Sequence, residues 1–128
     1  MAFKPDANIH TVTGKANEFI LTKEVRYYSK KYDMWVLVPV GFATDFASLP
    51  AFARVFINRN GKSRPAAVVH DRLCVTREVS RKRADQIFLE ALKYCNVSAI
   101  VRYSMYAAVR AYGRALTTTR AIKRRLGK

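Results

Sequence analysis

The stretch Ala66-Ala67-Val68-Val69-His70-Asp71-Arg72-Leu73-Cys74 is a short apolar run that ends in a histidine beside an aspartate. Two other segments also place an aspartate among apolar residues. The upstream one is Gly41-Phe42-Ala43-Thr44-Asp45-Phe46-Ala47-Ser48-Leu49-Pro50, and the downstream one is Ser80-Arg81-Lys82-Arg83-Ala84-Asp85-Gln86-Ile87-Phe88. We expect the three segments to meet around one polar cluster of His70, Asp71, Asp85 and Asp45.

Helix signals surround these segments. Ser63 followed by Pro65 predicts an N-capped helix that contains the quoted stretch and runs to about Thr76. Ser80 caps a third helix, and the apolar residues after it recur at the spacing of one helix face: Ala84, Ile87, Phe88, Ala91, Leu92 and Cys95. Ser48 before Pro50 predicts a short helix over about residues 50–57, and a fourth helix is expected to end near Gly113.

The N-terminal third is rich in strand-forming residues. Runs at residues 19–22, 25–28 and 35–40 are interrupted by the turn-like residues 30–33, and Pro39 suits a strand end because it cannot donate to a ladder. The predicted fold class is therefore α+β, with a small N-terminal antiparallel sheet or hairpin packed on three to four helices.

At 128 residues the chain has the length of one domain. We divide it into an extended arm at residues 1–16, with room for one edge strand, an α+β domain at residues 17–113 and a basic tail at residues 114–128. Cys74 and Cys95 are too few for a disulfide framework and lack metal-site spacing. No apolar run approaches the ~20 residues that span a bilayer. Since no signal-peptide pattern is present, we expect synthesis and folding in a cytoplasm.

The charge balance is strongly basic. Twenty-four Lys and Arg face nine Asp and Glu, which gives a net charge of +15 and a pI near 10.4. Such an excess favours a polyanionic partner, either nucleic acid or an acidic membrane or protein surface, with simple solubilisation as the alternative. Beyond Glu90 there is no acidic residue. The tail is then either a basic helix or an arm that orders on contact. Its candidate contact residues are Arg114, Arg120, Lys123, Arg124, Arg125 and Lys128.

Tyrosines and arginines alternate in the C-terminal third, a mixture that suits base stacking and phosphate binding. Tyrosines at helical spacing are, however, more typical of the edge of a core, and we favour that interpretation. The tyrosines are Tyr94, Tyr103, Tyr106 and Tyr112, and they lie among Arg102, Arg110 and Arg114.

The polar cluster allows a catalytic interpretation. His70 and Asp71 lie about 100° apart around a helix, so one can face a reacting water while the other reaches a cation. Asp85 could accept the second ring N–H of His70 and stabilise the imidazolium, as the acid does in a catalytic triad. Asp71 and Asp45, with loop carbonyls, would offer oxygen ligands to calcium or magnesium. Zinc is disfavoured because one histidine and no cysteine converge.

A structural interpretation stands beside it. Asp85 lies four residues after Arg81 and could simply pair with arginine. A histidine at the end of an apolar helical run is commonly a satisfied core residue, and Asp45 could cap a turn. The cluster would then be a polar network that holds the fold together.

The three motifs resemble a family of small bacteriophage and prophage proteins of unassigned function. Those proteins carry Gly-Phe-x-Thr-Asp-x-Ala-Ser-x-Pro, then Ala-Ala-x-x-His-Asp, then Ser-Arg-x-x-Ala-Asp-x-x-Phe. The matching segments here are residues 41–50, 66–71 and 80–88, and the resemblance spans about residues 35–113. It implies a phage-encoded protein, found among morphogenesis, tail or lysis genes, without defining an activity.

A narrower similarity is to calcium-dependent secreted phospholipases and the phospholipase domain of parvoviral capsids. Their His-Asp helix and second aspartate would make His70 the base, Asp71 a calcium ligand and Asp85 the orienting acid. The chain departs from them at Cys74, where many relatives have an aromatic residue, and it lacks their Gly-rich calcium loop and disulfides.

Two functions follow as expectations. The favoured one is a virion-associated head or tail protein, structural or accessory, whose basic surface docks on other virion proteins or non-specifically on packaged DNA. The alternative is a calcium-dependent hydrolase of phospholipase type, acting on the host envelope as the phage enters or lyses the cell. We favour the non-enzymatic role, and calcium is the candidate ion of the alternative.

Overall fold

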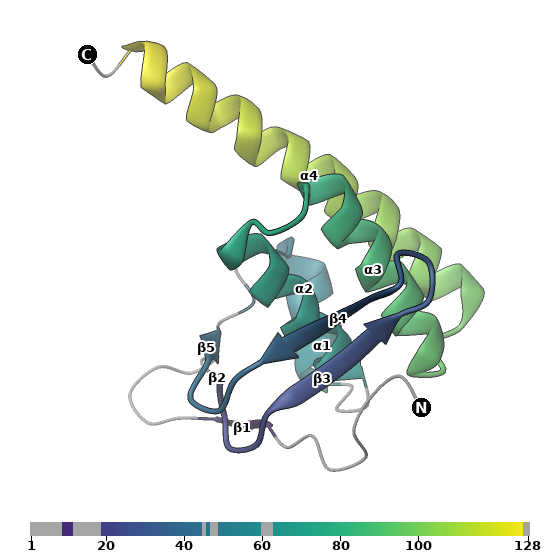
Figure 1. The fold of residues 1–128 in the computed structure, drawn as a ribbon. Coiled ribbons are helices and arrows are strands. Elements are labelled where there is room, and N and C mark those ends of the chain that lie inside the picture. Colours follow the sequence, from purple (N-terminus) through teal and green to yellow (C-terminus); the bar gives the residue numbers. More distant parts are fainter. Residues whose placement is uncertain (1–8, 12–18, 45, 47–48, 60–62, 127–128) are drawn as a thin grey trace.

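The computed structural model describes residues 9–11, 19–44, 46, 49–59 and 63–126. Within them the chain forms five strands followed by four helices, which confirms the predicted α+β class (Figure 1). The strands are β1 (Ile9–Thr11), β2 (Phe19–Leu21), β3 (Val25–Ser29), β4 (Met34–Val38) and β5 (Ala43–Thr44). The helices are α1 (Ala51–Arg59), α2 (Arg64–Thr76), α3 (Arg81–Tyr94) and α4 (Ala99–Leu126).

The strands form two antiparallel sheets. One has the order β1-β2-β5, and the other is the β3–β4 hairpin. β4 ends before Pro39, and Gly41, with φ 89°, turns the chain back toward β2. There the Gly41 N–H donates to the Leu21 carbonyl, at 2.9 Å. β5 therefore lies within the segment 41–50, where we had expected no strand.

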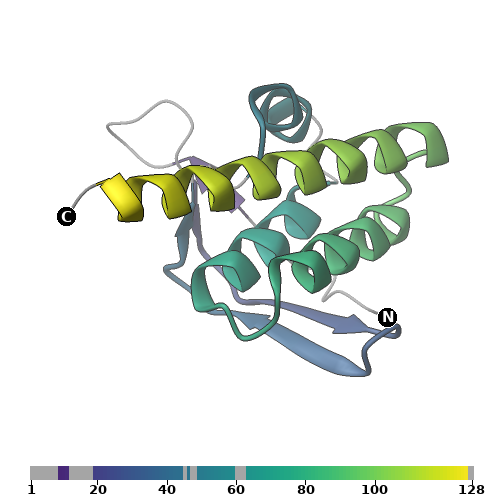
Figure 2. The same cartoon turned by 90° about the horizontal axis from the view of Figure 1, so that it is seen from above.

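The elements stack in three layers. Seen from above, α4 lies on one side, α2 and α3 are in the middle, and the β3–β4 hairpin is on the other side (Figure 2). The hairpin alternates as expected for a sheet with one buried face, since Val25, Tyr27 and Ser29 are buried and Arg26 is exposed. α2 packs on the β3–β4 hairpin and on α3, and its residues Ala66 to Asp71 are all buried.

The helix starts follow two different mechanisms. Ser80 has the extended backbone of an N-cap and its hydroxyl accepts a hydrogen bond from the Arg83 N–H, at 3.1 Å. Ser63 also precedes a helix, but its backbone is in the α region and its side chain makes no capping hydrogen bond. α2 thus starts at the predicted place without the predicted cap, with Pro65 in its first turn.

α4 corrects the expected end of the fourth helix. It continues through Gly113 to Leu126, so residues 114–126 adopt the helical alternative expected for the tail. A glycine inside a helix costs about 1 kcal/mol relative to alanine. Packing explains its place here, because a Cβ on Gly113 would lie 3.0 Å from Nε of Arg81. The last turns of α4 extend beyond α2 and α3 (Figure 1). Among the helices described, none combines the length and apolar character needed to cross a membrane.

Candidate functional site

A single carboxylate joins three helices. Oδ1 of Asp85, on α3, lies 2.7 Å from Nε2 of His70 on α2 and accepts a hydrogen bond from Nε of Arg81, at 2.9 Å. Oδ2 of Asp85 accepts a hydrogen bond from Nη1 of Arg110 on α4, also at 2.9 Å. We call His70, Arg81, Asp85 and Arg110 the Asp85 network. The expected contact between His70 and Asp85 is therefore present, and so is the arginine pairing of the structural interpretation.

Local structure explains why these side chains meet. α3 buries one face, and Asp85 lies within it between Ala84 and Ile87, so its carboxylate points into the interior. Arg81 is one turn earlier on the same helix and reaches the carboxylate along that face. Arg110 follows the buried Val109 on α4, which packs directly on α3.

Burial sets the electrostatics of the network. The side chains of His70 and Asp85 are 0% exposed, whereas Arg81 and Arg110 remain 24% and 18% exposed. Burial by itself lowers the pKa of His70, but the hydrogen bond to Asp85, the contact with Cys74 and the charge of Asp85 together outweigh it and hold that pKa above its ordinary value. Burial raises the pKa of Asp85, but His70, Arg81 and Arg110 together hold it below its ordinary value. Both pKa shifts favour the charged form of the group, the imidazolium of His70 and the carboxylate of Asp85.

The apolar side of the imidazole is also occupied. The ring of Phe88 packs on it with centroids 4.9 Å apart, and Sγ of Cys74 lies 3.8 Å from Nε2. The imidazole is thus enclosed by protein groups, with Nε2 directed at Asp85. The two arginines on Asp85 are the contacts that the structural interpretation expects, and the contact between His70 and Asp85 is common to both interpretations.

Of the two proposed metal ligands, only Asp71 lies in the part of the chain that the structure describes. Asp71 is 9% exposed and lies beside His70 on α2. Asp45 lies outside the described residues, so the expected pair Asp71 and Asp45 is not tested. Within the described residues, no three His, Cys, Asp or Glu side chains gather closely enough to hold a metal ion.

A second polar contact, which the sequence did not indicate, fastens the hairpin to α3. The Tyr27 hydroxyl donates a hydrogen bond to Oε1 of Glu90, and the Lys31 N–H donates to Oε2 at 3.0 Å. Next to it, the Tyr32 hydroxyl donates to Gln86, and the Arg83 guanidinium lies 4.5 Å from the centroid of the Tyr32 ring. Burial and the Glu90 carboxylate both raise the pKa of Tyr27.

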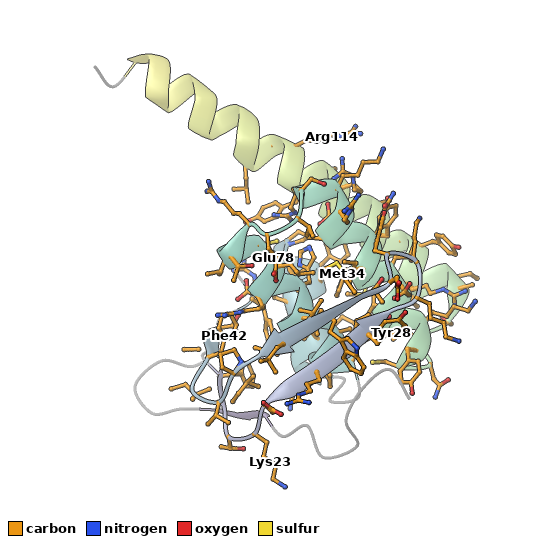
Figure 3. The ribbon with its side chains drawn as sticks, viewed as in Figure 1. Lys23, Tyr28, Met34, Phe42, Glu78 and Arg114 are labelled. Carbon is orange, nitrogen blue, oxygen red and sulfur yellow. The ribbon has the colours of Figure 1, made fainter. Side chains whose placement is uncertain are left out.

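The predicted basic and aromatic residues differ in how exposed they are and in whether their side chains are described. Arg114 is exposed on α4 (Figure 3), and Arg120, Lys123, Arg124 and Arg125 lie on its last turns, where only the backbone is described. Lys128 lies outside the described residues. Tyr94 and Tyr103 are 43% and 55% exposed, while Tyr106 and Tyr112 are half-buried as expected for a core edge.

Arg110 is the residue of the Asp85 network that the sequence did not identify. We had grouped it with the tyrosines as a phosphate contact, yet its guanidinium faces inward to Asp85. The one available signal was its position next to Val109 on the apolar side of α4.

Comparison with protein families matches residues 19–109 to DUF1353, described as a protein of unknown function. The chain belongs to this family. The match begins at β2 and ends one residue before Arg110, so it contains His70, Arg81 and Asp85 but neither Arg110 nor the basic end of α4. Comparisons with curated proteins and with solved structures gave no significant match.

Proposed function

We propose that this chain is a small phage-encoded, virion-associated protein that docks through the end of α4 on a polyanion, with packaged DNA as the favoured partner. The resemblance of residues 35–113 to small phage and prophage proteins supports the phage origin. The net charge of +15 supports a polyanionic partner.

One observation carries the docking role. Along one side of α4, apolar residues in the part that packs on α3 are followed by basic residues in the part that extends beyond it. The core-facing side of α4 is apolar at Met105 and Val109, both buried. At 100° per residue, Arg120 and Lys123 fall on that same side of the helix three to four turns later. By their position on the helix, these two residues place positive charge along the part of α4 that extends beyond α2 and α3 (Figure 1).

The Asp85 network gives this helix a rigid mounting. Arg110 ties the middle of α4 to α3, and His70 ties the same carboxylate to α2. A basic helix held at a fixed angle loses little conformational entropy on binding, so more of its charge attraction appears as affinity.

DNA binding is tested by fluorescence anisotropy of a labelled duplex over a range of salt concentrations. The triple variant Arg120→Gln, Lys123→Gln, Arg124→Gln should bind more weakly and lower the slope of log K against log salt by about 2–3, because each phosphate contact contributes about 0.9. A matched control is Arg77→Gln, Lys82→Gln, Lys93→Gln, which removes the same charge from exposed positions on the body. If the two triple variants weaken DNA binding equally, binding depends on the net charge of the protein and not on the position of these residues on α4.

The virion role is tested separately. Particles purified from a host that carries the gene should contain the protein by mass spectrometry, and the α4 triple variant should be depleted from them. A protein that stays with the host cell fraction contradicts the virion role. A protein that enters particles without binding DNA indicates an acidic virion protein as the docking partner.

The hydrolase is the second candidate, and the hydrogen bond between His70 and Asp85 is the observation that favours it. Under the phospholipase similarity, Asp71 and Asp45 would hold calcium. Activity on anionic phospholipid vesicles should then require calcium and disappear in Asp71→Asn while the unfolding curve stays unchanged. Two results together count against this candidate: a melting temperature that calcium does not change, and no release of fatty acid from the vesicles.

A further inference from the structure

We propose that the outer face of the β3–β4 hairpin binds single-stranded nucleic acid by stacking a base on Trp35. This goes beyond the docking role of α4 and does not rest on it, since the hairpin and α4 lie on opposite sides of α2 and α3 (Figure 2).

The face is a small aromatic platform. Trp35 on β4 and Tyr28 on β3 are cross-strand partners, and their ring centroids lie 5.3 Å apart. The neighbouring pair is Arg26 and Leu37, and a hollow of about 280 Å³ is lined by Arg26, Trp35, Val36 and Leu37. Trp35 is 60% exposed and Leu37 48% exposed, whereas the inward Val36 is buried.

The platform is held rigid by its own hydrogen bonds. The Tyr28 hydroxyl donates to Asp33 at the turn, which fixes the ring beside Trp35 (Figure 3 labels Tyr28 on β3). Glu24 pairs with Nε of Arg26, at 2.9 Å. Both acids of the hairpin are therefore engaged within it, and the Arg26 side chain is still 49% exposed.

The charges and aromatic rings of this face favour nucleic acid over a sugar as its ligand. Residues 22–40 contain Lys23, Arg26, Lys30 and Lys31 against two acids, so the hairpin segment carries a net positive charge. A stacking ring next to a guanidinium matches a base with its phosphate. A sugar ligand would need carboxylates or amides for its hydroxyls, and on this face Glu24 and Asp33 are already paired. Charge and stacking together favour a single strand, because its bases are open.

Trp35 is the chain's only tryptophan, so its fluorescence reports on this face alone. We expect a short oligothymidylate to quench the fluorescence of the full-length protein in a saturable way, and a duplex of equal length to leave it nearly unchanged. Trp35→Ala should weaken oligothymidylate binding, measured by anisotropy, on the order of tenfold. Trp35→Phe should recover part of that affinity, because a smaller aromatic ring can still stack on a base.

The control is Tyr103→Ala, which removes an exposed ring beside Arg102 on α4. The proposal predicts unchanged oligothymidylate binding for this variant. Equal losses for Tyr103→Ala and Trp35→Ala, or binding without quenching, would overturn the hairpin site. Quenching by polyglutamate as strong as that by oligothymidylate would also overturn it, in favour of an acidic protein surface. The α4 triple variant should retain the quenching even if it loses duplex binding.

Discussion

Nε2 of His70 lies 2.7 Å from Oδ1 of Asp85, and both side chains are fully buried. Two guanidiniums contact the same carboxylate from α3 and α4. The carboxylate of Asp85 is thus the point at which α2, α3 and α4 are joined, and its removal would leave three donors without an anion.

Asp85→Ala should destabilise the protein by about 3–5 kcal/mol, because breaking a buried ion pair leaves uncompensated charge in the interior. Urea denaturation followed by circular dichroism measures this loss. Glu78→Ala, at an exposed acid, is the matched control and should change the free energy of unfolding by about 0.5 kcal/mol or less. Equal effects of the two variants would mean that the Asp85 network contributes little to stability.

The stabilising contribution of His70 to the free energy of unfolding should decrease as the pH rises above neutrality. Because its pKa is raised in the folded state, its contribution is complete below the unfolded value near 6.5 and is lost as the pH passes through the folded pKa. His70→Gln keeps a donor near Asp85 but cannot titrate. The difference in unfolding free energy between wild type and His70→Gln should be constant below about pH 6 and shrink at higher pH. A pH-independent difference would contradict the raised pKa.

Asp85 should produce the opposite dependence at acid pH. Its pKa is lowered in the folded state, so its contribution is present above the unfolded value near 3.8 and is lost as the pH falls through the folded pKa. Wild type should therefore lose more stability than Asp85→Asn between about pH 4 and 2. Thermal melts of both proteins across that range would show converging melting temperatures.

The effect of Gly113→Ala on the free energy of unfolding should depend on whether Arg81 is present. In wild type the new Cβ would lie 3.0 Å from Nε of Arg81, the atom that donates to Asp85, so the helical gain is offset. In an Arg81→Ala background the same change should stabilise the protein by about 1 kcal/mol, the difference in helix propensity. Unfolding free energies of the four proteins give the coupling energy. A similar gain in both backgrounds would show that Arg81 moves aside without cost.

Tyr27→Phe should loosen the hairpin from α3. Its hydroxyl is buried and donates to a carboxylate of Glu90, so we expect a loss of about 1–2 kcal/mol in urea denaturation. Tyr103→Phe, at an exposed ring, is the control and should be close to neutral. In a spectrophotometric titration, Glu90→Gln should allow one tyrosine to ionise at lower pH, because Glu90 contributes to the raised pKa of Tyr27.

Much of the fold could be predicted because its signals are local. Helical periodicity and the Ser80 cap located α3, and Pro65 marked the first turn of α2. Strand-forming runs interrupted by residues 30–33 located the β3–β4 hairpin. The second sheet was missed because β5 is only two residues long and forms through pairing with β2. The end of α4 was misplaced because a glycine usually marks a helix end, whereas Gly113 makes room for Arg81.

The sequence by itself determined the α+β class, the approximate positions of the first three helices, the basic character of the C-terminal end and the pairing of His70 with Asp85 as a hypothesis. Only the tertiary structure decided that Asp85 binds His70, Arg81 and Arg110 together, and that Phe88 packs on the imidazole. The reason is physical: periodicity and capping depend on neighbours within a few residues, whereas Arg110 is 25 residues from Asp85 and reaches it only after α4 packs on α3.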